Sequence, residues 1–251
     1  MELEELLAAV EAGDVAVEEA LSRIEGFRRV GDVARVDHDR RDRVGVPEAV
    51  LADAKDPDDL REIVAAQVAA EDHVVVTRVD AATRDAIEGV GDRQRWHDRA
   101  GVLVVEAADH EPPEERGRVA VVSGGTSDVP VAEEARVTAA EMGCATETHY
   151  DVGVAGIHRL LGDVDDIDAC DAVVVAAGRE GALPTVVAGL VDAPVIGLPV
   201  SVGYGVGGGG EAALQSMLQS CAVLTVVNVD AGFVAGAQAG QIARAAGDGD
   251  G

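Results

Sequence analysis

The second half of the chain alternates short apolar runs with helix-like stretches, and this alternation limits most strongly what the chain can fold into. The runs are almost continuously apolar, which is typical of strands buried on both faces of a sheet. Strands of this kind, separated by helices, form a parallel sheet covered on both sides. We predict strands over 119–123, 146–151, 172–176, 194–199 and 223–229. Helices are predicted over 129–142, 154–162, 181–191, 211–220 and 234–246.

The expected fold is therefore an α/β domain of the flavodoxin-like, three-layer kind, preceded by a smaller α+β domain. The charged, proline-rich segment 109–117 is the best linker in the chain. It gives an N-terminal domain over 1–112, a second domain over 118–247 and an acidic, glycine-rich tail over 248–251. Before the linker we expect two short helices up to residue 28 and a strand or exposed loop within 30–44. A turn at 45–48, a helix capped by Asp58 or Asp59 and running to 70, and strands at 73–77 and 101–105 follow.

Charge and composition exclude several classes of function. The net charge is −27, from 47 acidic and 20 basic residues, and Lys55 is the single lysine. This balance resembles proteins of salt-loving cytoplasms, where concentrated salt screens carboxylates from one another. A nucleic-acid partner is not expected, because a polyphosphate backbone would be repelled. Three cysteines without a close pair indicate free thiols in a reducing cytoplasm, and no apolar run reaches membrane-spanning length.

The loops that follow the predicted strands are the expected ligand site, because parallel sheets bind ligands beyond the carboxyl ends of their strands. The first such loop contains Ser123, Gly124, Gly125, Thr126, Ser127 and Asp128 and opens a helix. Its backbone N–H groups, at the positive end of the helix dipole, can hold a phosphate. The alternative is a plain helix start capped by Ser127 or Asp128, with Pro130 in the first turn. That alternative leaves the two glycines unexplained, so we expect a phosphorylated small molecule.

Motifs in these loops resemble the aminoimidazole ribotide carboxylase (PurE-like) family of purine synthesis. They are Gly124-Gly-Thr-Ser-Asp128, Gly156-Ile-His-Arg159, Ala177-Gly178 with Leu183-Pro184, and Val195-Ile-Gly-Leu-Pro199. Gly125 stands where that family has a serine and Ala182 where it has a second histidine, while Arg179 and Glu180 replace small residues. The phosphate-binding parts persist and the groups facing the reacting ring differ, which favours a different substrate.

A fuller resemblance, over nearly the whole chain, is to the LarB family. It rests on Gly45-Val-Pro-Glu48 followed by Lys55, on Thr77-Arg78, and on Met217-Leu-Gln-Ser-Cys221 followed by the segment 226–233. The resemblance implies a carboxylase and hydrolase acting on nicotinic acid adenine dinucleotide. Its products would be AMP and pyridinium-3,5-biscarboxylic acid mononucleotide, in the first step of nickel-pincer cofactor synthesis. Carbon dioxide or bicarbonate would be the second substrate.

The chemistry implied by the resemblance needs a nucleophile, because an electron-poor pyridinium cannot attack carbon dioxide unaided. A thiolate that adds at C2 or C4 leaves C5 electron-rich and can later depart, and the resemblance implies Cys221 in this role. Spacing alone favours a small buried cysteine instead. Cys221 precedes the strand predicted at 223–229, so it should lie at the sheet edge away from the ligand loops. It can reach a ligand only if the helix before it stops early or if the site is shared between subunits. We expect a homo-oligomer with shared sites, an octamer by resemblance.

Other polar residues in these segments have two readings each. His158 and Glu180 are candidates for removing the C5 proton; alternatively, His158 contacts phosphate or ribose and Glu180 complements a helix dipole. Arg159 and Arg179 can bind a carboxylate or phosphate or form salt bridges. Lys55 can stabilise charge on a phosphoanhydride or lie on the surface. Gly178, Arg78, Pro199 and Gly203 complete the predicted substrate-binding set, with 203–210 as a mobile active-site loop.

No cofactor is firmly implied by the sequence. The histidines show no ligand spacing with the cysteines, so no metal ligands are assigned. Mg²⁺ could assist anhydride cleavage, but no carboxylate cluster identifies its site. Two rivals remain: an aminoimidazole ribotide carboxylase or mutase, and a non-catalytic module that binds a dinucleotide or nucleotide.

Overall fold

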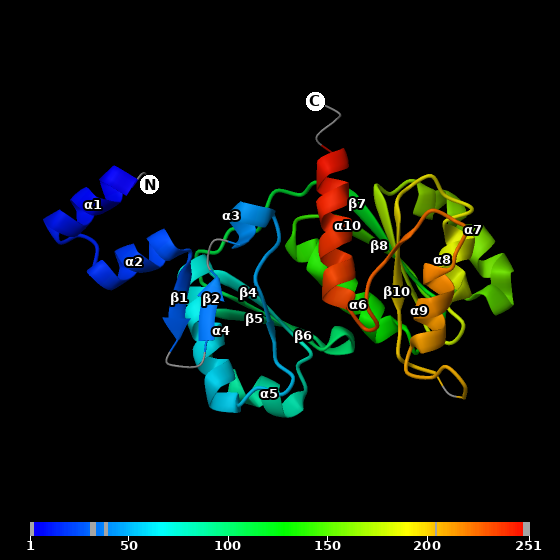
Figure 1. Cartoon of the computed structure of the whole chain (residues 1–251), viewed down its shortest axis with the longest axis horizontal. Helices are drawn as coiled ribbons and strands as arrows, with labels where there is room; N and C mark the ends of the chain where they lie inside the picture. Colours follow the sequence, from blue (N-terminus) through cyan, green and yellow to red (C-terminus); the bar gives the residue numbers. More distant parts are fainter. Residues whose placement is uncertain (1–2, 31–33, 38–39, 204, 248–251) are drawn as a thin grey trace. The chain divides into compact units, whose positions relative to one another are not determined.

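The computed structural model describes residues 3–30, 34–37, 40–203 and 205–247 (Figure 1). The tail expected at 248–251 and Tyr204 of the glycine-rich loop lie outside these ranges. The chain divides into two compact units, Met1–Arg95 with Leu103–His110, and Trp96–Val102 with Glu111–Gly251. Among the described residues, no helix is both long and apolar enough to cross a membrane.

The first unit combines helices with a four-stranded mixed sheet of order β3-β4-β6-β5. Strand β3 runs parallel to β4, and β6 runs antiparallel to β4. In chain order the elements are α1 (Leu3–Ala12), α2 (Val17–Glu25), β1 (Phe27–Val30), β2 (Ala34–Asp37), α3 (Arg40–Val44), β3 (Ala49–Leu51), α4 (Pro57–Glu71), β4 (His73–Thr77), α5 (Ala81–Ala86), β5 (Arg93–His97) and β6 (Val102–Glu106). The short helix η1 (Asp98–Ala100), between β5 and β6, is grouped with the second unit.

The helix cap and the segment 30–44 of the first unit differ from the sequence prediction. Helix α4 begins at Pro57, and its cap is Asp56, whose side chain accepts the Asp58 N–H at 2.9 Å; neither Asp58 nor Asp59 is the cap. Asp56 is the cap because Pro57 follows it at the first helical position. The fixed φ of proline suits that position, and its missing N–H breaks no hydrogen bond of the helix. The segment 30–44 forms more structure than the predicted strand or loop, since β1 and β2 pair in a hairpin and α3 follows.

The second unit is the predicted three-layer α/β domain. Its five strands are all parallel, in the order β11-β10-β9-β7-β8. This is the flavodoxin-like order 2-1-3-4-5 read from the other edge. The elements are β7 (Arg118–Ser123), α6 (Val129–Glu141), β8 (Ala145–His149), η2 (Val154–Gly156), α7 (Ile157–Asp168), β9 (Ala172–Ala177), α8 (Ala182–Val187), β10 (Val195–Pro199), α9 (Glu211–Leu218), β11 (Thr225–Val226) and α10 (Gly232–Ala246).

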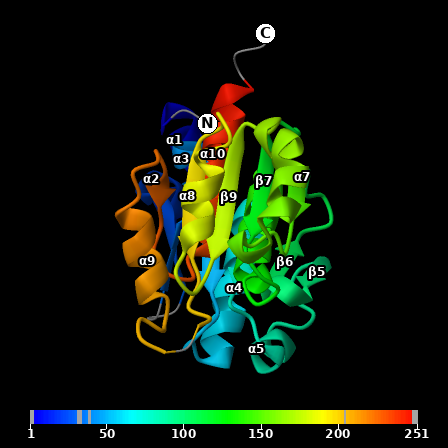
Figure 2. The ribbon, with the colours of Figure 1, turned by 90° about the vertical axis from the view of Figure 1, so that its right-hand side faces the viewer.

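Helices cover both faces of this sheet, and each face has its own apolar core (Figure 2). On one face, small residues let α10 lie against α6: a Cβ added at Gly236 would fall 2.2 Å from the Ala135 carbonyl oxygen. On the other face, α7, α8 and α9 bury residues such as Leu160, Leu183 and Met217. The sheet itself is built from valine and alanine, so the core needs almost no aromatic residues.

The last predicted strand is much shorter than expected. Only Thr225 and Val226 pair with β10, whereas the sequence predicts a strand over 223–229. Val223 is 95% exposed, so the apolar run there does not mark a buried strand. An edge strand has one neighbour only, which leaves its ends without pairing.

Candidate active site

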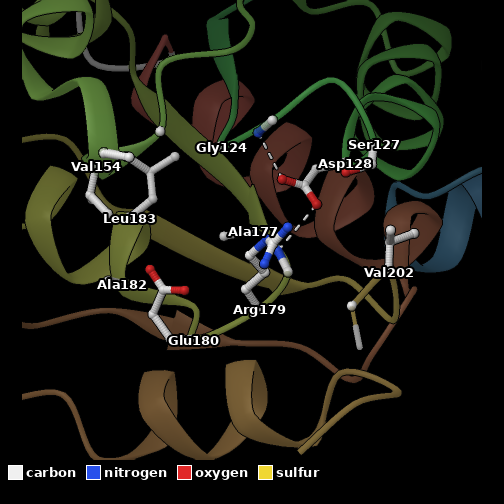
Figure 3. Close-up of a pocket in the computed structure, with 15 residues that line it drawn as sticks. Gly124, Ser127, Asp128, Val154, Ala177, Arg179, Glu180, Ala182, Leu183 and Val202 are labelled. Atoms are coloured by element: carbon white, nitrogen blue, oxygen red, sulfur yellow. Dashed lines mark hydrogen bonds between the residues drawn. The ribbon is translucent and has the colours of Figure 1, made fainter. Parts of the chain in front are cut away.

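A pocket lies where the strand order reverses. Strand β7 lies between β8 and β9, so the loops after β7 and β9 diverge and open a crevice at the carboxyl edge of the sheet. The pocket has a volume of about 430 Å³, which suits a small-molecule ligand. It is lined by Gly124, Gly125, Ser127, Asp128, Gly153, Val154, Ala155, Ala177, Gly178, Arg179, Glu180, Ala182, Leu183, Val202 and Gly203 (Figure 3).

Asp128 ties the two walls of the pocket together. Its carboxylate accepts the Gly125 N–H at 2.8 Å and the Gly178 N–H at 3.2 Å. Asp128 occupies the N-cap position of α6 but makes no side-chain cap bond there, because both oxygens are directed to these loops. Burial raises the pKa of Asp128 above its ordinary value of 3.8, although the two N–H groups and the Arg179 charge oppose the shift.

Several backbone N–H groups of the predicted phosphate-binding loop 123–128 already donate hydrogen bonds within the protein. The Gly124 N–H donates to Ala176 and the Asp128 N–H to Gly125, and the Gly125 N–H is taken by Asp128. Within the described part of the chain, the N–H groups of Thr126 and Ser127 make no hydrogen bond. A ligand anion would therefore meet this turn through Thr126 and Ser127 rather than through the glycines.

The glycines bring the loops close to one another. A Cβ on Gly178 would lie 2.4 Å from the Val202 carbonyl oxygen, and one on Gly153 would lie 2.4 Å from the Gly124 carbonyl oxygen. No side chain fits at either position without moving backbone. Gly178 was predicted as a substrate-binding residue. Gly153 lies in a predicted ligand loop, but the sequence does not reveal its close approach to Gly124.

Arg179 and Glu180 supply charged side chains on the pocket wall, just after β9. Both are exposed, and Arg179 adopts a left-handed backbone with φ of 50°, which is uncommon for a residue other than glycine. The pocket continues into a second hollow of about 220 Å³ formed with Gly203 and the glycine-rich loop. Arg179 and Glu180 line both cavities.

Several predicted residues lie outside the pocket lining. Ser123 is fully buried, and its hydroxyl accepts the Asp151 N–H at 3.3 Å, so it holds the loop after β8 instead of facing a ligand. Pro199 is buried at the end of β10. Arg159 forms an exposed ion pair with Asp151, and His158 is exposed on the first turn of α7.

Lys55 and Arg78 follow neighbouring parallel strands of the first unit's sheet. They follow β3 and β4, two parallel strands whose last residues, Leu51 and Thr77, are paired. Arg78 contacts Asp53 at 3.2 Å, and Lys55 is half-buried. Both residues were predicted individually. Because they are 23 positions apart in the sequence, it gave no sign that they follow neighbouring strands.

Cys221 lies apart from the loops that form the pocket. It is exposed and comes between α9 and β11, before a parallel strand. The pocket, in contrast, is built from loops that follow the strands. Within the described chain Cys221 does not line the pocket, although its neighbour Ser220 accepts a hydrogen bond from Thr185 of α8 at 2.9 Å.

Comparisons with known proteins agree with this architecture. Residues 27–107 match the LarB/PurE-like N-terminal domain, and residues 118–248 match the AIR carboxylase domain. An uncharacterized protein of Methanocaldococcus jannaschii is 36% identical over 258 residues, which cover 96% of this chain and 97% of the relative. With the parallel sheet and the pocket at its switch point, these matches show that the chain belongs to the LarB-like, PurE-related carboxylase family.

Proposed function

We propose that this protein carboxylates the pyridinium ring of nicotinic acid adenine dinucleotide at C5 and then hydrolyses the phosphoanhydride. The observation that best supports this proposal is the composition of the pocket wall. Ala182 stands there in place of a second histidine, and Arg179 with Glu180 replaces small residues. A guanidinium suits a substrate that already bears a carboxylate and phosphates. The neutral aminoimidazole of the purine enzyme has less need of it at the ring.

The proposed reaction begins with the Cys221 thiolate adding to C2 or C4 of the ring. This addition turns the pyridinium into an enamine, whose C5 attacks carbon dioxide and forms the new C–C bond. A base then removes the C5 proton, and the electrons of that bond restore the aromatic ring as the thiolate leaves. Water finally cleaves the phosphoanhydride to give AMP and the biscarboxylate mononucleotide.

The proton acceptor in this proposal is Glu180, because it lines the pocket whereas His158 does not. Asp128 holds the two loops in place through backbone N–H groups, and Thr126 with Ser127 offers N–H groups to a phosphate. Lys55 and Arg78 of the first unit carry the kind of cationic groups that bind a phosphate. Among the described residues, no carboxylate cluster fits Mg²⁺.

In this proposal Cys221 reaches the ring from a neighbouring copy of the chain, because it does not line the pocket of its own chain. The proposal therefore includes a homo-oligomer with composite sites. Such sharing is common where closed symmetry brings the same patches together repeatedly. In this arrangement a monomer is inactive.

The test is incubation of the full chain with the dinucleotide and labelled bicarbonate in concentrated KCl. We expect label in a biscarboxylate mononucleotide, release of AMP, and a trapped adduct on Cys221 by mass spectrometry. The Cys221→Ala variant should form no product. Turnover of aminoimidazole ribotide instead, or dinucleotide binding without turnover and unchanged by Cys221→Ala, would overturn the proposal.

Mixing inactive variants tests the shared site. Cys221→Ala and Glu180→Gln subunits, unfolded together and refolded in equal amounts, should regain about a quarter of wild-type activity if each site takes one residue from each of two chains. Each variant refolded alone is the control. If both residues of a site came from the same chain, the mixture would stay as inactive as its parents.

A further inference from the structure

Three side chains with metal-binding chemistry meet at one end of the first unit's sheet. His73 begins β4, and Glu106 ends β6. The two residues are register partners in an antiparallel pair, so their side chains lie on the same face. His110 follows four residues after Glu106, and its N–H donates to Ala107 at 3.3 Å, which closes a turn that brings its ring back to the strand ends.

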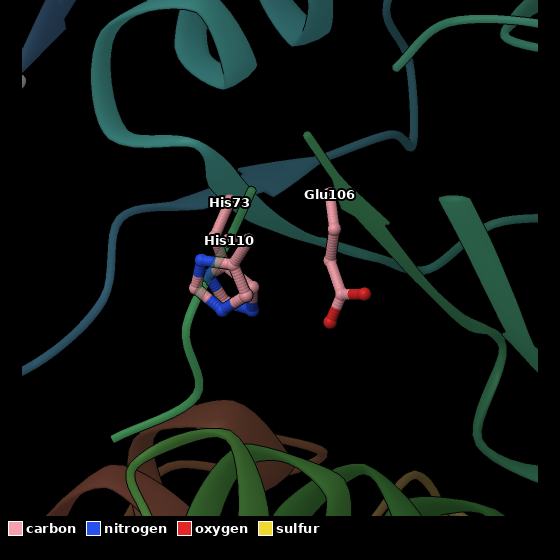
Figure 4. A group of neighbouring side chains, drawn as sticks. All are labelled: His73, Glu106 and His110. Atoms are coloured by element: carbon pink, nitrogen blue, oxygen red, sulfur yellow. The ribbon is translucent and has the colours of Figure 1, made fainter. Parts of the chain in front are cut away.

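The cluster is compact and mostly withdrawn from solvent. The rings of His73 and His110 stack with centroids 4.8 Å apart and an angle of 19° between planes. One nitrogen of each ring and a Glu106 oxygen lie within 4.8 Å of one another. His73 is 4% exposed and Glu106 is 7% exposed, while His110 is half-buried. Figure 4 shows the carboxylate beside the two overlapping rings.

Arginines hold the carboxylate and the turn in position. Arg95 contacts one Glu106 oxygen at 2.8 Å, and Arg93 contacts the other at 3.4 Å. Arg93 also donates to the His110 carbonyl oxygen at 3.1 Å. Each carboxylate oxygen has two lone pairs, so these contacts leave acceptor capacity on Glu106. Outer hydrogen bonds of this kind are usual for carboxylates and histidines that bind metals.

We propose that His73, Glu106 and His110 form a binding site for a divalent first-row transition metal ion, with Zn²⁺ as the best match. Two imidazoles and one carboxylate suit Zn²⁺, whereas Mg²⁺ prefers oxygen ligands alone. In a tetrahedral site with bonds of about 2.0–2.1 Å, ligand atoms are about 3.3 Å apart. The stacked rings would have to turn so that one nitrogen of each faces the ion, and a water would complete the coordination.

The site is independent of the proposed carboxylation. All three ligands belong to the first unit, and none of them lines the pocket. The ion would join the start of β4 to the turn after β6, and thereby fix the point where the chain leaves the first unit toward the segment 111–117. Because an ion that binds only the folded state stabilises it, we expect a structural consequence.

The experiment is Zn²⁺ binding to the full chain without an affinity tag, first stripped with chelator and then dialysed against limiting metal. We expect one Zn²⁺ per chain, an X-ray absorption spectrum with nitrogen and oxygen neighbours and no sulfur, and a higher melting temperature than the stripped protein. His110→Ala and Glu106→Gln should each weaken binding by more than about tenfold, since even the loss of an outer partner commonly costs 10- to 100-fold.

Matched controls separate this site from other ligands. His149→Ala removes a half-buried histidine elsewhere, one that contacts Asp163, and Cys221→Ala removes the exposed thiol. Both should bind one Zn²⁺ with unchanged affinity. The proposal is overturned if Zn²⁺ does not bind, if sulfur appears in the spectrum, or if folded His110→Ala and Glu106→Gln variants, checked by circular dichroism, bind as tightly as the wild type.

Discussion

At the scale of single residues, Asp128 shows how one buried carboxyl can organise a site. Its oxygens satisfy N–H groups on two loops that come from different strands. A side chain that only capped α6 could not do this. The pattern Ser-Asp before a helix predicts a cap, and it gives no sign of the second partner fifty residues away.

The first prediction concerns the pH dependence contributed by Asp128. Burial raises its pKa above 3.8, so the folded state favours the protonated form. The resulting stabilisation is complete below pH 3.8 and is lost as pH rises through the raised pKa. The unfolding free energy of the wild type minus that of Asp128→Asn should therefore fall as the pH rises above 3.8. Denaturant titrations of both proteins at several pH values measure this difference.

Asp80 is a control of opposite sign for that measurement. Hydrogen bonds from the Thr83 backbone and side chain lower the pKa of Asp80, which caps α5. Its stabilisation is present above pH 3.8 and is lost as pH falls through the lowered pKa. The wild type minus Asp80→Asn difference should rise with pH. Parallel slopes for the two aspartates would contradict the assignment of Asp128.

At the scale of elements, the packing of α10 on α6 depends on glycine. A Cβ on Gly236 would lie 2.2 Å from the Ala135 carbonyl oxygen, a distance that requires the helices to separate. We expect Gly236→Ala to destabilise the protein by about 1–3 kcal/mol, the usual cost of overpacking a core. Denaturant unfolding in concentrated salt measures the loss.

Gly162 provides the matched substitution. It lies inside α7, and a Cβ added there meets no atom within 4 Å. Gly162→Ala should stabilise the protein by about 0.5–1 kcal/mol, because alanine is the better helix former. If both glycine variants gained stability, the close approach of α6 and α10 would be wrong.

Elements were predictable from the sequence where the pattern was long and apolar. Strands β7, β9 and β10 are confirmed, because burial on both faces leaves an apolar run. Strand β8 is also confirmed, although its residues are polar and only partly buried. Strand β5, with the sequence Arg93-Gln-Arg-Trp-His97, was missed because its exposed residues resemble a loop. Strand β3 was missed because it has three residues. At 223–229 the predicted strand is longer than the observed one, because the apolar run begins with the exposed Val223.

The site was predictable only in part, for a related reason. Topology selects the loops at the carboxyl edge, and Gly124, Asp128, Gly178 and Glu180 do line the pocket. Whether a side chain faces the cavity depends on local geometry, which placed Ser123 in the core instead. The grouping of His73 with His110 depends on strand register and a turn, so their spacing in sequence carried no signal.

At the scale of the whole molecule, the net charge of −27 dominates behaviour in dilute buffer. Like charges at the surface repel one another over about 8 Å at 0.15 M salt but over only about 3 Å at 1 M. Self-repulsion of this kind disfavours the compact state. The composition of the chain therefore predicts that its stability depends on salt more than on any single contact.

The final prediction is that concentrated KCl raises the unfolding free energy. Two added lysines should make the protein more stable at low salt. Asp165 and Asp166 are exposed near the carboxyl end of α7, where the helix dipole favours cations. The double variant Asp165→Lys with Asp166→Lys should be more stable than the wild type at 0.15 M KCl, by about 0.3–1 kcal/mol for each position. That advantage should vanish at 2 M KCl because the interaction is screened.

Sucrose is the control, because it stabilises proteins without screening charge. If the advantage of the double variant persists in 2 M KCl, the gain in stability comes from helix propensity and not from charge.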